Sequence, residues 1–177
     1  REQYWKADAR VEAYRALLDS LTAEHFGVDD ASHFIDYGMD IDLENFEESV
    51  EEFPQEDKER LADAREVASE RRFFHWNVEF PEVFFERGNG GVKRKEDAGF
   101  DAVNGNPPWG VHLTDMGEDY VRQSFESAIS TRDSFALMTE RSLTLLRQGG
   151  ELGYIVPSGW QTGKSYTHFR NYILSVA

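Results

Sequence analysis

The stretch GFDAVNGNPPW occupies residues 99–109 and decides how the chain is interpreted. Its apolar part, FDAV at 100–103, is a short run typical of a β-strand. The residues that follow end in Asn106, Pro107, Pro108 and Trp109. Two consecutive prolines fix two φ angles and push the residues before them into extended conformations. We therefore predict a strand that runs into a stiff loop.

The residues after this loop alternate between helix and strand patterns. Apolar residues recur at helical spacing over 118–130, 133–147 and 165–175, and an apolar run occupies 151–156. Apolar strands separated by a helix are typical of a parallel sheet. The sequence thus predicts an α/β fold, a partial Rossmann-like sheet with parallel strands near 100–104 and 151–156.

The residues before the first strand have a different character. Helical patterns cover 2–25, 42–52 and 55–72. The aromatic segment FFHWNVEFPEVFF at 73–85 predicts a short buried strand, a turn at Pro81 and a further apolar run. Glycines at 88, 90 and 91 predict an exposed loop over 86–98. We expect two parts: a mostly helical acidic segment at 1–98, with this aromatic lead-in and loop, and an α/β part at 99–177.

Acidic residues are concentrated in the first part. The net charge is −15; residues 1–98 hold 13 Lys/Arg and 26 Asp/Glu, whereas residues 99–177 hold 6 and 8. Residues 36–59 alone contain eleven acids and one base, Lys58. Surfaces that grip nucleic acid need Lys and Arg for the phosphates. We expect weak DNA binding, or none, by this chain alone.

Lysine is scarce among the basic residues, with five Lys against fourteen Arg. A high acid content with little Lys is typical of proteins adapted to strong salt, where screening relieves the repulsion between carboxylates. Two alternatives stay open: one solvated acidic helix face, or a surface that imitates the phosphates of nucleic acid.

Several classes of protein are excluded by composition. The chain has no cysteine, which excludes disulfide scaffolds, cysteine nucleophiles and thiolate zinc sites. Its five histidines are scattered without metal-ligand spacing, so we expect no metal site.

No apolar run reaches ~18 residues, and no signal peptide is visible, so we expect a cytoplasmic protein without a membrane span. The first residue is Arg1, and we expect an internal piece of a larger protein.

The loop at 106–109 has an unusual set of hydrogen-bonding groups. It follows a parallel strand, and ligands of α/β sheets bind at the carboxyl ends of strands. Proline has no N–H, so the local backbone offers carbonyls, and Asn106 adds a side-chain carbonyl. Two rigid acceptors suit a primary amine, and Trp109 adds a flat face for a base, worth ~1–3 kcal/mol by analogy with single-strand binding. An exocyclic amine of a nucleobase fits both features.

The string GFDAVNGNPPW resembles motif IV of the amino-methyltransferases that use S-adenosylmethionine, above all the N6-adenine DNA methyltransferases. FHWNVEFPEVF upstream and DSFALMTERSLTLLRQGGELGYIVPSGW downstream are similar to the methylase of large fused (type IIG-like) restriction-modification enzymes. The resemblance covers about residues 73–174. It implies that 99–177 is a partial methyltransferase catalytic subdomain, and that the full-length enzyme acts on double-stranded DNA with a flipped adenine.

The resemblance also implies roles for individual residues. Asn106 and the Pro107 carbonyl would hold the target amine, Pro108 would stiffen the loop, and Trp109 would stack on the base. Phe135 and Met138 lie one turn apart on a helix that resembles motif V, so one of them would line the cofactor pocket; the alternative is ordinary core packing.

Two features of the family are missing. Its members have a glycine-rich turn after the first strand for the methionine end of S-adenosylmethionine and an acidic residue after the second strand for the ribose, and neither is found here. We therefore expect the main cofactor site outside this chain and no activity from the isolated fragment. Fragments of an RNA guanine-amine methyltransferase or of a protein glutamine methyltransferase stay open as alternatives, as does a non-enzymatic acidic interaction module.

Overall fold

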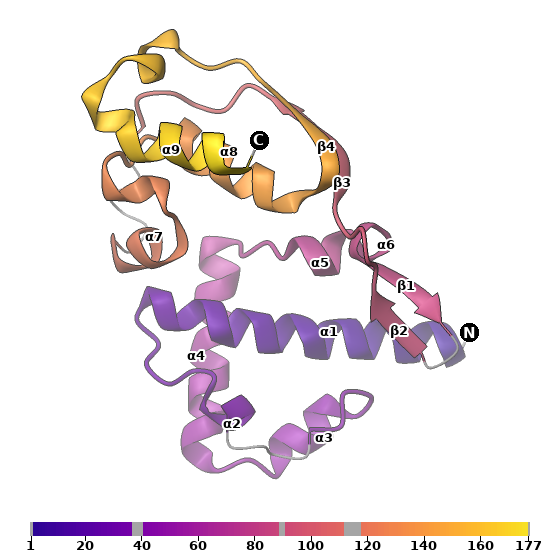
Figure 1. Cartoon of the computed structure of the whole chain (residues 1–177). Helices are drawn as coiled ribbons and strands as arrows, with labels where there is room; N and C mark the ends of the chain where they lie inside the picture. Colours follow the sequence, from indigo (N-terminus) through magenta and orange to yellow (C-terminus); the bar gives the residue numbers. More distant parts are fainter. Residues whose placement is uncertain (1, 37–40, 89–90, 112–117, 177) are drawn as a thin grey trace. The chain divides into compact units, whose positions relative to one another are not determined.

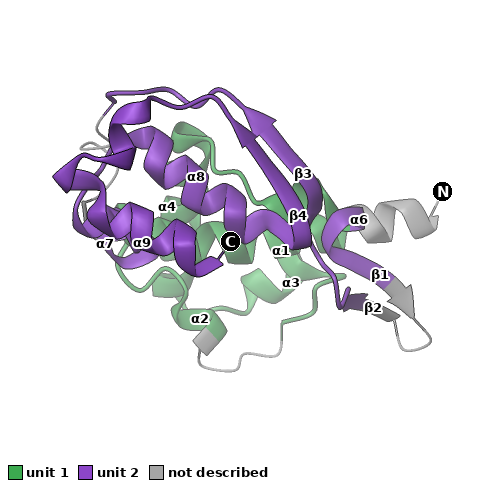
Figure 2. Ribbon diagram, turned by 45° about the horizontal axis from the view of Figure 1, so that its top comes forward, with its two compact units in different colours: residues 1–81 green, residues 82–177 purple. Residues whose placement is uncertain are grey.

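The computed structural model describes residues 2–36, 41–88, 91–111 and 118–176. The chain divides into two compact units, Arg1–Pro81 (unit 1) and Glu82–Ala177 (unit 2), which Figure 2 draws in different colours. The composition changes later, at 98/99. Residues 82–98 belong to unit 2 because they are tied to the start of the next strand: Gly99 N–H donates to Val83 O at 3.4 Å, and the rings of Phe84 and Phe100 meet edge to face at 5.7 Å.

The regular secondary structure of unit 1 is helical in its described residues, with loops between the helices. Its helices are α1 (Glu2–Ala23), η1 (Glu24–Phe26), α2 (His33–Asp36), α3 (Phe46–Glu51), α4 (Gln55–Arg71) and α5 (Trp76–Glu79). The patterns at 2–25, 42–52 and 55–72 therefore correspond to helices, with shorter bounds for α3. Pro54 precedes the first residue of α4, and Arg72 ends that helix in the left-handed conformation at φ 56°.

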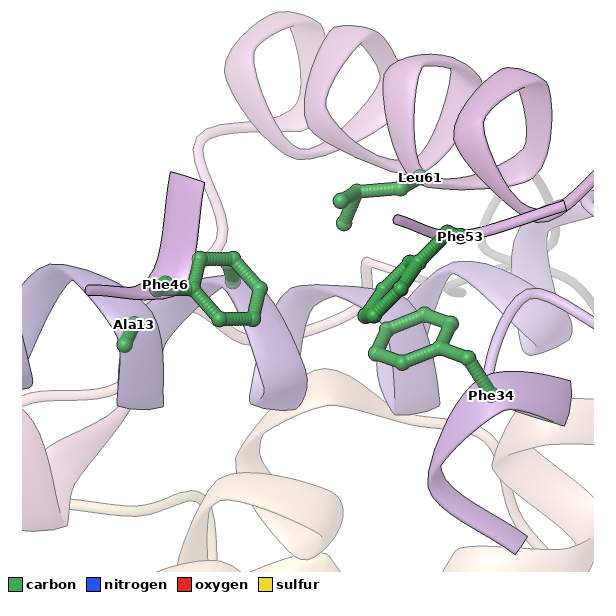
Figure 3. Close-up of a cluster of buried hydrophobic side chains, with 6 residues drawn as sticks. Ala13, Phe34, Phe46, Phe53 and Leu61 are labelled. Carbon is green, nitrogen blue, oxygen red and sulfur yellow. The ribbon is translucent and has the colours of Figure 1, made fainter. Parts of the chain in front are cut away.

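The core of unit 1 gathers aromatic rings between α1 and α4. Figure 3 shows the rings of Phe34, Phe46 and Phe53 beside Ala13 of α1 and Leu61 of α4. Phe34 and Phe53 lie 5.1 Å apart, and all five residues are 7% exposed or less. Small alanines on α1 leave room for these rings, so the acidic segment is folded around an apolar centre.

The prediction of a buried strand in the aromatic segment at 73–85 is wrong. Two short helices, α5 and α6 (Pro81–Phe84), occupy most of it. The N–H groups of Val78 and Glu79 donate to the carbonyl of His75, which closes a helical turn. Aromatic content favours strands only through the surface against which it packs, and here Trp76 stacks at 5.8 Å on Phe80, one helical turn away.

The predicted loop at 86–98 is also wrong in part. Strands β1 (Phe85–Gly88) and β2 (Gly91–Arg94) form an antiparallel hairpin, with Phe85 opposite Arg94. Gly88 and Gly91 form the last described pair of the hairpin, and Gly90 lies outside the described residues.

The rest of unit 2 confirms the α/β prediction. Its elements are β3 (Phe100–Gly105), α7 (Glu118–Ser124), η2 (Ser127–Ile129), α8 (Ser134–Leu145), β4 (Leu146–Tyr154), η3 (Ser158–Gln161), η4 (Lys164–Tyr166) and α9 (Thr167–Val176). Strands β3 and β4 are parallel neighbours, with Val103 opposite Leu152 (Figure 1). The helix that connects them, α8, packs against α9 through Phe135, Ala136 and Phe169.

Strand β4 begins earlier than the sequence predicted. Leu146 already pairs with Phe100, and the register then shifts so that Ala102 pairs with Glu151. Gly149, at φ 74°, lies inside this irregular stretch. The two glycines at 149–150 therefore lie in an irregular, bulged part of the strand.

Candidate active-site loop at the carboxyl edge of the parallel strands

The Asn-Pro-Pro-Trp loop leaves the sheet at the carboxyl ends of β3 and β4. It follows Gly105, the last residue of β3, and Ile155 N–H still donates to the Gly105 carbonyl at 3.1 Å. The strand pairing therefore continues up to the first residue of the loop. This edge is where open parallel sheets bind ligands, so the structure places the loop as the sequence predicted.

The carbonyl groups around this loop divide into used and available acceptors. The Gly105 carbonyl accepts from Ile155, and the Pro108 carbonyl accepts from the Ser134 hydroxyl at 2.7 Å. Among the described residues, no hydrogen bond reaches the side-chain carbonyl of Asn106 or the backbone carbonyl of Pro107. Asn106 is exposed and Pro107 is buried. The two acceptors expected to hold an amine are therefore among the acceptors that no described group occupies.

The indole N–H of Trp109 is hydrogen-bonded, and its ring is half-exposed. Its indole N–H donates to the carbonyl of Ile155 at 3.3 Å, and the residue is 50% exposed. Ile155 directly follows β4, so this contact joins the loop after β3 to the residue after the neighbouring strand. A half-exposed ring held in this way can offer a face to a planar ligand.

The N-terminus of α8 holds the other end of the loop, and we call this set of contacts the α8 clamp. Ser134 Oγ donates to Pro108 O, Ser134 N–H donates to Val111 O at 2.9 Å, and both carboxylate oxygens of Asp133 accept from Gly110 N–H at 3.1 and 3.3 Å. Gly110 has φ 65°, a conformation that residues with a Cβ rarely adopt. The clamp therefore fixes the backbone on the far side of Trp109.

Asp133 is the residue of this site that sequence reasoning missed. It is the N-cap of α8, accepting from Phe135 N–H at 3.5 Å, and it is only 6% exposed. Tyr166 OH also donates to its Oδ2 at 3.2 Å. Burial of the phenol raises the pKa of Tyr166, and the negative charge of Asp133 raises it further. An Asp immediately before an apolar helical run is an N-cap pattern. The sequence could therefore have predicted the cap, but no sequence pattern predicts the contact between Asp133 and Gly110.

The structure separates Phe135 and Met138, one of which was predicted to line a cofactor pocket. Phe135 is 1% exposed, and its ring meets those of Tyr166 and Phe169 at 5.6 Å each. Met138, one turn later, is 42% exposed. Phe135 therefore packs as a core residue, whereas Met138 has surface that a ligand could touch. Cofactor binding by this pair stays a prediction.

Among the described residues, the glycines at 88 and 91 do not form the glycine-rich strand-to-helix turn of the family. Gly88 and Gly91 face each other across the β1–β2 hairpin, and β2 leads to no helix that could present its N-terminus to a ligand; Gly90 lies outside the described residues. Within the described ranges, no group of three or more His, Asp or Glu side chains is placed to hold a metal ion.

Comparison with known proteins identifies the family. The profile described as Eco57I restriction-modification methylase matches residues 7–176, nearly the whole chain. The chain belongs to this family. Its members are methylases of restriction-modification systems, and the resemblance found in the sequence is thereby confirmed at the level of the family.

Two curated relatives match shorter stretches of this methylase chain. It is 30% identical over 97 residues to the putative type II restriction enzyme and methyltransferase RM.MjaORFECS2P of Methanocaldococcus jannaschii, a match that covers 55% of this chain and 7% of that protein. It is 38% identical over 64 residues to the type II restriction enzyme and methyltransferase RM.Eco57I of Escherichia coli, covering 33% of this chain and 6% of that protein. No solved structure matches the chain.

Among the described residues, every helix of this methylase chain is too short or too polar to cross a bilayer.

Proposed function

We propose that the chain is the target-amine-binding part of an S-adenosylmethionine-dependent DNA adenine-N6 methyltransferase that acts in the cytoplasm as part of a restriction-modification system. The observation that carries the proposal is the pair of available acceptors, Asn106 Oδ1 and Pro107 O, on a loop that is held by the bonds from Ser134 to Pro108 O and from Trp109 to Ile155 O. Membership of the restriction-modification methylase family supports DNA as the substrate.

The chemistry of adenine explains why such a pair is useful. The exocyclic amine of adenine is a poor nucleophile because its lone pair is delocalised into the ring. Two acceptors that bind both hydrogens draw the nitrogen toward tetrahedral geometry and localise the lone pair on it. A nitrogen in that state reacts more readily with an electrophilic methyl group, and its proton can leave afterwards. The loop therefore contributes positioning and fixed dipoles.

The remaining loop residues help to hold the target base in place. A base inside a duplex is out of reach, so enzymes of this kind swing the target nucleotide out of the helix. The half-exposed ring of Trp109 provides a stacking face for that base, and Pro108 with the α8 clamp keeps the loop from relaxing. Since the described glycines form a hairpin and no strand-to-helix turn, we expect the methyl donor to be bound mainly by residues outside the described ones.

The experiment measures N6-methyladenine in unmethylated phage DNA after single-turnover reaction with the full-length protein. Losing an acceptor that acts mainly in the transition state typically costs ~10²–10³ in rate, so Asn106→Ala is expected to lower methyl transfer by that factor. Asn106→Asp keeps one acceptor oxygen and is expected to retain partial activity. Asn171→Ala, at an exposed position on α9, is the matched control.

Each outcome distinguishes the proposal from its competitors. A near-normal rate for Asn106→Ala would show that the loop has another role. Methyl incorporation into RNA or into protein glutamine, with none into DNA, would favour the alternative methyltransferases. The absence of any transfer by the wild type would favour an acidic interaction module.

A further inference from the structure

Unit 2 contains an open groove of about 650 Å³ that we call the arginine groove. Its polar lining comes from Arg122, Ser130, Thr131, Arg132, Ser165 and Tyr166. These residues belong to α7, to the segment between η2 and α8, and to η4. The described lining includes two arginines and no acidic residue, although the chain as a whole has a net charge of −15. The groove is therefore a local exception to the acidic character of the protein.

The wall of the arginine groove is bonded to the loop through Asp133. Asp133 N–H donates to Thr131 Oγ1 at 3.2 Å, and Tyr166 OH donates to Asp133 Oδ2 at 3.2 Å. The same carboxylate accepts from Gly110, next to Trp109. Asp133 thus bonds to Thr131 through its backbone and to both Tyr166 and the loop through its carboxylate, so a ligand in the groove lies near the segment that is proposed to hold the target base.

The polar groups of the groove suit an oxyanion. A guanidinium has five N–H donors, so Arg122 and Arg132 can each bind phosphate oxygens while keeping the interactions that they already make within the chain. The Ser130 hydroxyl is buried and has no hydrogen-bond partner among the described residues. An unsatisfied buried hydroxyl is costly, and a phosphate oxygen would give it an acceptor.

We propose that the arginine groove binds a backbone phosphate of the DNA next to the flipped nucleotide. This inference rests on the proposed function, because it takes the target base to lie at Asn106 and Pro107. A flipped base stays attached to its sugar and phosphates, so the adjacent backbone must pass close to the loop. Phosphate contacts fix the position of a protein on DNA without reading its sequence. The groove therefore supplies local attraction that the acidic surface lacks.

The experiment compares full-length variants in binding to a labelled DNA duplex over a range of salt concentrations. Arg122→Gln and Arg132→Gln are each expected to weaken binding severalfold and to reduce the slope of log K against log salt by about 1. The KM for DNA should rise, while kcat at saturating DNA stays near the wild-type value. Arg132→Lys should restore the slope, because Lys keeps the charge.

A second pair of variants tests the groove without removing an arginine. Ser165 is exposed and lines the groove, so Ser165→Glu should weaken DNA binding by repelling the phosphate. Ser175→Glu, at an exposed position of α9 outside the lining, should not. Arg147→Gln is the arginine control, since Arg147 pairs with Asp101 at the amino ends of β3 and β4, away from the loop.

The outcomes separate this inference from the proposed function. If the wild type methylates adenine but both glutamine variants and Ser165→Glu keep its salt slope and affinity, the groove is not a phosphate site, and the proposed function stands. If the wild type transfers no methyl group to DNA yet the variants lose the slope as expected, the groove is a DNA contact, and the proposed reaction is wrong.

Discussion

The carboxylate of Asp133 accepts the backbone N–H of Gly110 through both oxygens, at 3.1 and 3.3 Å. The two residues are 23 positions apart in the chain, and the contact joins the N-cap of α8 to the loop that follows β3. The same side chain also accepts from Phe135 N–H and Tyr166 OH. One buried carboxylate therefore couples the start of a core helix, the candidate active-site loop and the wall of the arginine groove.

Replacement of Asp133 by Ala is expected to lower both stability and methyl transfer. The loss of an N-cap costs about 0.5–2 kcal/mol, and Gly110 N–H also loses its acceptor, which loosens the loop. A displacement of about 1 Å can lower a rate by 10². Chemical unfolding and single-turnover transfer at saturating DNA give the two effects separately. Asp101→Ala, which removes an exposed partner of Arg147, serves as control.

Ser134→Ala separates the loop contact from the helix cap. It removes the donor to the Pro108 carbonyl and leaves Asp133 in place, so transfer should fall while the unfolding free energy changes by only about 1 kcal/mol. Thr144→Ala removes a comparable hydroxyl-to-carbonyl bond, to Arg141, elsewhere on the same helix. Equal transfer rates for the Ser134 and Thr144 variants would contradict a positioning role for the α8 clamp.

Substitutions of Trp109 are expected to separate stacking from anchoring. Trp109→Ala removes the ring and should weaken retention of the flipped base by ~1–3 kcal/mol. Trp109→Phe keeps a flat ring but loses the N–H bonded to Ile155 O, so it should retain the base better than Ala and transfer more slowly than wild type. Fluorescence of 2-aminopurine placed at the mapped target adenine reports base retention.

The control for this series is Trp76→Phe in unit 1, which should leave that fluorescence unchanged. Equal base retention by Trp109→Ala and the wild type would refute the stacking role.

Alkaline pH is expected to destabilise the protein partly through Tyr166. Its pKa is raised in the folded state, by burial first and then by Asp133. The folded state therefore holds the phenolic proton more tightly than the unfolded chain, whose tyrosines titrate near pH ~10. The stabilisation that the protonated phenol provides is fully present below about pH 10. It is lost as the pH rises through the raised pKa of Tyr166 in the folded state. Tyr166→Phe should make the decline of unfolding free energy shallower; parallel curves for variant and wild type would show that Tyr166 does not contribute.

Added salt is expected to stabilise the 177-residue chain. The exposed acids of unit 1 include Glu48 and Glu52, and they repel their neighbours when unscreened. The melting temperature should rise from low to molar potassium chloride. The double variant Glu48→Gln/Glu52→Gln should melt higher at low salt and respond less to added salt. A flat or falling melting temperature of the wild type would exclude adaptation to high salt.

The 177-residue chain alone is expected neither to bind S-adenosylmethionine tightly nor to transfer a methyl group. The described residues offer no glycine-rich strand-to-helix turn, and the hairpin glycines at 88 and 91 pair with each other. Titration calorimetry on the chain should show no micromolar binding, whereas the full-length protein should bind. Tight binding by the chain would place a cofactor site within it.

The sequence by itself was sufficient for the parallel strands, for α8 and for the position of the loop at 106–109. Each depends on local signals: apolar runs, helical spacing, and prolines that restrict their own backbone. The same kind of signal failed at 73–85, where aromatic residues predicted a buried strand and short helices formed instead. Aromatic content says that a segment will pack, whereas the surface against which it packs decides its conformation.

Only the tertiary structure decided which groups of the site are available and which are occupied. The Pro108 carbonyl is used because Ser134, 26 residues later, donates to it, and no local pattern encodes that pairing. Asp57 makes the same point in the acidic segment: it is 1% exposed, and its carboxylate lies 3.1 Å from both His33 Nδ1 and Arg60 Nη1. Sequence spacing determines which face of its own helix or strand a residue occupies. The partner that meets it comes from another segment of the chain, and only the packing of the two segments brings them within hydrogen-bonding distance.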